Sequence, residues 1–101
     1  MIYFVTQGNE FVKIGYTANK PEKRLYNLQT GNPHKLVLSL VIHGNKGYEK
    51  ALHDMFSAHS VHLEWFHLSN DIKVFMSGRK DVRYELDNDI IDIHSNLMAL
   101  R

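Results

Sequence analysis

Apolar residues in the first 43 positions cluster in three short runs that are typical of β-strands. Residues 2–6 (IYFVT) and 11–17 (FVKIGYT) are rich in β-branched and aromatic side chains and flank a four-residue polar connection. This pattern predicts a β-hairpin. The third run, residues 36–43 (LVLSLVIH), predicts a further strand that Gly44 and Asn45 end.

Apolar spacing of three and four residues predicts three helices between and after these strands. The first starts within residues 19–22, whose Asn, Pro and Glu have the spacing of a helix start, and ends at Gly31. The second covers about residues 46–58. A short extended stretch at 63–68 precedes the third helix, which Ser69 can cap. This order of elements predicts an α+β domain, a small antiparallel three-stranded sheet flanked by helices.

Residues 78–101 read as an extension of a domain formed by residues 1–77. Apolar side chains recur in it at helical spacing and predict an added C-terminal helix: Ile90, Ile93, Leu97 and Leu100. Such a helix either packs on its own domain or pairs with a partner. A homodimer and a protein partner that supplies specificity therefore both stay open.

The composition fits one globular domain, because 44% of the 101 residues are hydrophobic. The chain has no cysteine, which excludes disulfides, a thiolate nucleophile and a zinc–sulfur site. No stretch supplies the ~20 apolar residues of a membrane-spanning helix, and the N-terminus lacks a signal-peptide pattern. We therefore expect a soluble cytoplasmic protein with no membrane contact.

Charge is distributed unevenly along the chain. Residues 1–50 hold seven Lys and Arg against three Glu, whereas residues 51–101 hold five against eight acidic residues. A basic half suits a partner that carries phosphates, while ordinary mixing of surface charges explains the asymmetry equally well.

The N-terminal hairpin resembles that of the GIY-YIG nuclease superfamily, with IYF in place of GIY and KIG in place of YIG. The stretch TANKPEKRLYNLQTGNPHKL that follows is similar to a phage and bacterial branch of this family, as are EKALHDMF (49–56) and EWFHLS (64–69). The resemblance covers residues 2–76. Four motifs in the same order make it more specific than the hairpin alone.

This resemblance implies hydrolysis of DNA phosphodiester bonds with Mg²⁺ or Mn²⁺ as cofactor. Arg24 matches the family's helix arginine, and its planar guanidinium suits two phosphate oxygens. Glu64 matches the metal-binding glutamate, and one carboxylate can suffice for a hard cation that keeps several waters. Lys20, Lys23 and Lys35, in the basic half, are candidate DNA contacts.

Four further residues are candidates for holding or activating the attacking water. Tyr3 matches the first-motif tyrosine, whereas Lys13 replaces the second, and an ammonium accepts no proton unless its pKa is lowered. Tyr16, three residues on, is a candidate for an exchange of roles with Lys13. His53 is either a base or a polar residue on the outer face of its helix.

Two classes of function fit these residues. The first is a metal-dependent endonuclease. The second is a GIY-YIG-like domain that binds nucleic acid or protein without cutting. Two departures from the family pattern favour it: Lys13 replaces the second-motif tyrosine, and Leu63 stands where the branch has glycine directly before the glutamate. Trp65 and Phe66 could stack on bases, but their place beside the third helix favours a core position.

Overall fold

The hairpin predicted from the first two apolar runs forms the centre of the sheet. In the computed structural model, which describes residues 1–79, β1 (Ile2–Gln7) pairs antiparallel with β2 (Phe11–Tyr16). Their connection has three residues rather than the four predicted, and Gly8 within it takes a left-handed φ of 58°. The third predicted strand, β3 (Leu36–Ile42), pairs antiparallel with the other edge of β1.

The prediction of a three-stranded sheet was wrong, because the sheet has five strands in the order β3-β1-β2-β5-β4. The extended stretch before the third helix contributes β5 (Trp65–His67), which pairs with β2. At the edge lies β4 (Ser60–His62), whose three residues are all exposed. A strand this short and this exposed shows no alternation of apolar and polar residues, so the sequence pattern does not reveal it.

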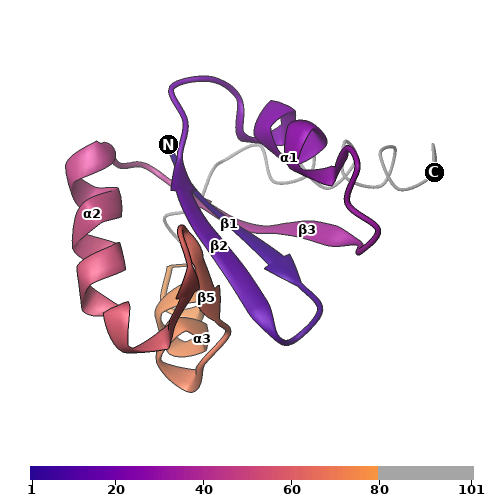
Figure 1. Cartoon of the computed structure of the whole chain (residues 1–101). Coiled ribbons are helices and arrows are strands. Elements are labelled where there is room, and N and C mark those ends of the chain that lie inside the picture. The colour runs from indigo at the N-terminus through magenta and orange to yellow at the C-terminus, as the bar shows by residue number, and fades with distance from the viewer. Residues whose placement is uncertain (80–101) are drawn as a thin grey trace.

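Helices cover both faces of the sheet (Figure 1). One face packs against α1 (Pro21–Gln29) through buried Leu25. The other packs against α2 (Lys46–Met55) and α3 (Asn70–Ser77) through Leu52 and Ile72. The α+β class predicted from the element order is therefore confirmed.

The helix ends largely follow the predicted signals. Ser69 caps α3, its side chain accepting the N–H of Ile72. The second helix is shorter than predicted, because a 3₁₀ turn (Ser57–His59) replaces its last residues. The first helix begins at Pro21 as expected, but no side chain caps it. The backbone N–H of Asn19 instead bonds Thr17 Oγ1.

The predicted C-terminal helix, with Ile90 to Leu100, lies outside the described residues 1–79. Within those residues, none of the helices has the length and hydropathy that crossing a bilayer requires.

Candidate active site

Tyr3 lies at the centre of the face covered by α1. The register pairs it with Gly15 on β2, and only 1% of its surface is exposed. A Cβ built on Gly15 would lie 2.3 Å from both Cζ and the hydroxyl oxygen of Tyr3. The phenol ring therefore crosses directly over Gly15, and only a glycine leaves room for it.

Arg24 on α1 reaches this phenol from above, and its Nε donates a hydrogen bond of 3.3 Å to the Tyr3 hydroxyl. Burial raises the pKa of Tyr3 above its ordinary value, the Arg24 hydrogen bond lowers it, and the charge of Glu64 raises it again. Burial is the largest effect, so the phenol keeps its proton at neutral pH. With Arg24 as donor, that proton is free to be given to a ligand oxygen.

A second pair of polar residues lies on the same face of the sheet, where Lys13 is two residues from Gly15 on β2. Lys13 Nζ is 2.9 Å from Glu64 Oε1, with side chains 11% and 38% exposed. An ammonium has three donors and no lone pair. In this geometry Lys13 directs one of these donors at the Glu64 carboxylate.

The two pairs share one electrostatic environment. The pKa of Arg24 is raised, chiefly by its hydrogen bond to Tyr3 and in part by the negative charge of Glu64. The structure thus brings together four of the residues that the sequence singled out: Tyr3, Lys13, Arg24 and Glu64. They come from three separate segments of the chain.

His53 approaches the same strand from its edge. Its Nε2 lies 2.7 Å from the Ile14 carbonyl, so Nε2 carries the proton and donates it. The N–H of Ile14 donates to the Glu64 carbonyl at 3.0 Å. Ile14 therefore anchors both α2 and the residue before β5. His53 also packs edge-on against Phe66, at 5.1 Å between ring centroids, and these contacts tie α2 to β2 and β5.

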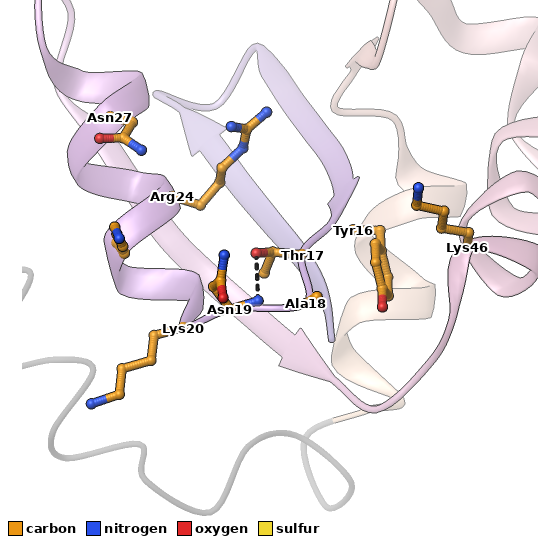
Figure 2. A pocket seen from close by; sticks show the side chains of 9 residues that line it. Tyr16, Thr17, Ala18, Asn19, Lys20, Arg24, Asn27 and Lys46 are labelled. Atoms are coloured by element: carbon orange, nitrogen blue, oxygen red, sulfur yellow. Dashed lines mark hydrogen bonds between the residues drawn. The ribbon is translucent and has the colours of Figure 1, made fainter.

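Tyr16 does not join the Tyr3 cluster. Successive residues of a strand point to opposite faces, so Tyr16 lies on the face opposite Lys13 and packs on the core under α2 and α3. Figure 2 shows its ring near Lys46, with the hydroxyl directed away from Arg24. Strand geometry therefore separates Tyr16 from the position where it could replace the missing tyrosine.

A groove rich in lysine opens beside Arg24, at the end of β2 (Figure 2). We call it the basic groove. Its lining includes Tyr16, Arg24 and three lysines: Lys20, Lys23 and Lys46. Lys35 lies elsewhere. It precedes β3, whose first residue pairs with Gln7, at the opposite end of the sheet from Tyr3.

Sequence reasoning missed two of these positions. Gly15 was seen only as part of a motif, although a register that places it opposite Tyr3 would have indicated its role. Lys46 follows Asn45, whose side chain caps α2 by accepting the N–H of Tyr48. That cap fixes Lys46 at the first turn, where it reaches the groove.

The donor atoms at this cluster allow only a weakly held cation. Within residues 1–79, no group of three or more His, Asp or Glu side chains is arranged to hold a metal. Glu64 presents one carboxylate, and Lys13 contacts its Oε1. Its other oxygen fits a Mg²⁺ or Mn²⁺ that retains most of its water, but the neighbouring ammonium weakens the attraction.

The family model described as the T5orf172 domain matches residues 1–83. The chain belongs to this family. T5orf172 domains occur in phage and bacterial proteins and are linked to nuclease-like folds related to GIY-YIG. No curated protein and no solved structure gives a significant match. Family membership is consistent with a nuclease or DNA-binding role for the cluster described above.

Proposed function

We propose that this T5orf172 protein is an endonuclease of the GIY-YIG type that hydrolyses DNA phosphodiester bonds with Mg²⁺ or Mn²⁺. One observation carries the proposal: the Tyr3–Arg24 and Lys13–Glu64 pairs lie at neighbouring positions on one face of the β1–β2 hairpin. This arrangement offers fixed positive charge, a hydroxyl donor and a carboxylate within one small area. Hydrolysis of a phosphodiester needs these groups, because negative charge develops on the phosphate oxygens.

Each residue has a role that its geometry permits. Arg24 uses Nε on Tyr3, which leaves its terminal N–H groups for non-bridging phosphate oxygens. The Tyr3 hydroxyl donates to the phosphate or to the attacking water. Glu64 would hold the cation, which would supply charge that polarises the phosphate and stabilises the leaving oxygen. Lys13 orients the Glu64 carboxylate until the cation binds.

The reaction itself is a displacement at phosphorus. The water oxygen forms a bond to phosphorus, and the bond to one ester oxygen breaks. The attacking water loses a proton to solvent, and the departing alkoxide gains one. Both products, a phosphate monoester and a hydroxyl, leave the chain unchanged.

The basic groove gives the DNA backbone a path to this cluster. Lys20, Lys23 and Lys46 line it together with Arg24, and none of its lining residues is acidic. We assign these three lysines to phosphate contacts, which add affinity without sequence preference. Lys35 is not part of this path.

A nicking assay tests the proposal. Supercoiled plasmid is incubated with the full chain and Mg²⁺ or Mn²⁺, and we expect nicked circles that EDTA prevents. Glu64→Gln and Arg24→Ala should each lower the rate about 10²- to 10³-fold, as loss of one charge-stabilising group does. Glu10→Gln and Tyr26→Ala are matched controls, since both side chains are exposed outside the cluster.

A second function has one observation in its favour. The Lys13 ammonium already neutralises the carboxylate that a cation would need, as expected of a domain that binds DNA without cutting it. In that case wild type gives no nicking with either metal. DNA binding would then be unaffected by Glu64→Gln and weakened by Lys20→Ala.

A further inference from the structure

A second groove, of about 300 Å³, lies at the other end of β2 from the basic groove. We call it the aromatic groove. Two aromatic rings, one valine, two amides and one histidine line it: Phe11, Trp65, Val61, Gln7, Asn32 and His62. None of these lining residues is a carboxylate. Phe11 and Trp65 are only partly buried, although Trp65 also packs against the core of the α1 face, whereas neighbouring Phe66 is 2% exposed.

The aromatic groove adjoins the proposed active site through Trp65. Trp65 directly follows Glu64 and pairs with Lys13 on β2. The Lys13 ammonium lies 5.9 Å from the centre of the Trp65 ring. Phe11 and Lys13 are two residues apart on one strand, so both point to the same face. A DNA strand with one phosphate at Arg24 and Glu64 would therefore place its next nucleotide beside Trp65.

The chemistry of the lining fits a nucleobase. Indole and phenyl faces stack on any base, and amide and imidazole groups can hydrogen-bond base edges. Base faces in a duplex are covered by neighbouring base pairs, so only an unpaired base can use such a groove.

We propose that the aromatic groove binds an unpaired nucleobase next to the scissile phosphate, so that the substrate is DNA with a single-stranded segment at the cut. This inference rests on the proposed function. Duplex phosphates occupy the basic groove on one side of the cleavage point, and the unpaired nucleotide occupies the aromatic groove on the other. Specificity then comes from DNA structure and not from base sequence.

Trp65 allows a direct test, because it is the only tryptophan of the chain. The full chain in EDTA is titrated with a blunt duplex, with the same duplex carrying a short unpaired overhang, and with an overhang of abasic nucleotides. We expect quenching of Trp65 and about 10-fold tighter binding only with the base-bearing overhang. The abasic overhang keeps the phosphates, so it separates stacking from charge.

A variant tests whether the unpaired base binds in the aromatic groove. Phe11→Leu should reduce the preference for the base-bearing overhang in an anisotropy titration with labelled DNA, whereas Tyr26→Leu, an exposed aromatic on α1, should leave it unchanged. Equal affinity for blunt, abasic and base-bearing DNA would overturn the inference. If plasmid nicking is observed without this preference, the inference fails and the nuclease stands. If the preference is found without any cleavage, hydrolysis fails and the base site stands.

Discussion

The two faces of the sheet are built from alternate residues of the same strands, and each carries a buried apolar cluster, but the α1 face also carries the Lys13–Glu64 ion pair. On the face under α2 and α3, Phe4, Ile14 and Phe66 pack in a core at most 4% exposed. On the face under α1, Tyr3 and Lys13 are buried, and Glu64, the partner of Lys13, is partly exposed. Two helices cover the first face, whereas α1 alone covers the second, where the Glu64 side chain is 38% exposed.

This difference shows how a small chain separates stability from chemistry. Burying an unpaired charge is costly, so polar groups persist only where they find partners or solvent. The α1 face provides both, through the Lys13–Glu64 pair and the Tyr3–Arg24 hydrogen bond. Substitutions on the two faces should therefore affect different properties.

The largest expected effect lies on the face under α2 and α3. Phe66→Ala removes a ring that packs among β2, α2 and α3, and should lower the free energy of unfolding by about 3–5 kcal/mol. Urea denaturation followed by circular dichroism measures it. A loss similar to that of an exposed residue such as Tyr26→Ala would show that this face is not the main core.

Gly15→Ala should lower both the stability of the chain and its nicking activity. Its Cβ would overlap the Tyr3 ring, so the ring must move, at a cost of about 1–3 kcal/mol in unfolding free energy. The displaced hydroxyl also loses Arg24, and we expect nicking to fall. Gly78→Ala is the matched control, because its Cβ meets nothing closer than 3.6 Å. Equal stability of the two variants would contradict the close approach of Tyr3 to Gly15.

Lys13→Met should strengthen cation binding. Removing the ammonium frees Glu64, and Mn²⁺ affinity should rise about fivefold, the ~1 kcal/mol of a charge pair at 4 Å in water. Isothermal titration calorimetry reads this without any need for activity. Lys50→Met, which removes the exposed pair with Asp54, should leave the affinity unchanged. Unaltered or weaker Mn²⁺ binding by Lys13→Met would count against Glu64 as the ligand.

The smallest effect concerns the pH dependence of stability. Burial raises the pKa of Tyr3 above 10.0, so the folded chain holds the phenol proton more tightly than the unfolded chain. This contribution is constant below pH 10 and is lost as pH rises through the folded-state pKa. Tyr3→Phe, about 0.5–1.5 kcal/mol less stable at neutral pH, should approach wild type at alkaline pH. An unchanged gap, measured by urea denaturation, would contradict the raised pKa.

The parts of the fold that could be predicted are those with local causes. Capping by Ser69 and the alternating runs of the hairpin act within a few residues. The pairing of β5 with β2 and the Lys13–Glu64 pair depend on segments far apart in the chain, which no spacing rule can connect. The separation of Tyr16 from Lys13 has a local cause instead: the two residues are three apart on one strand, so they lie on opposite faces of the sheet.

The most direct measurement asks whether Arg24 and Glu64 act on one phosphate. Single-turnover cleavage of a labelled oligonucleotide is compared for wild type, Arg24→Ala, Glu64→Gln and the double variant. Residues that act as a unit lose activity non-additively, so we expect the double variant to be no slower than the slower single one. A double variant whose loss equals the product of the two single losses would contradict a shared site.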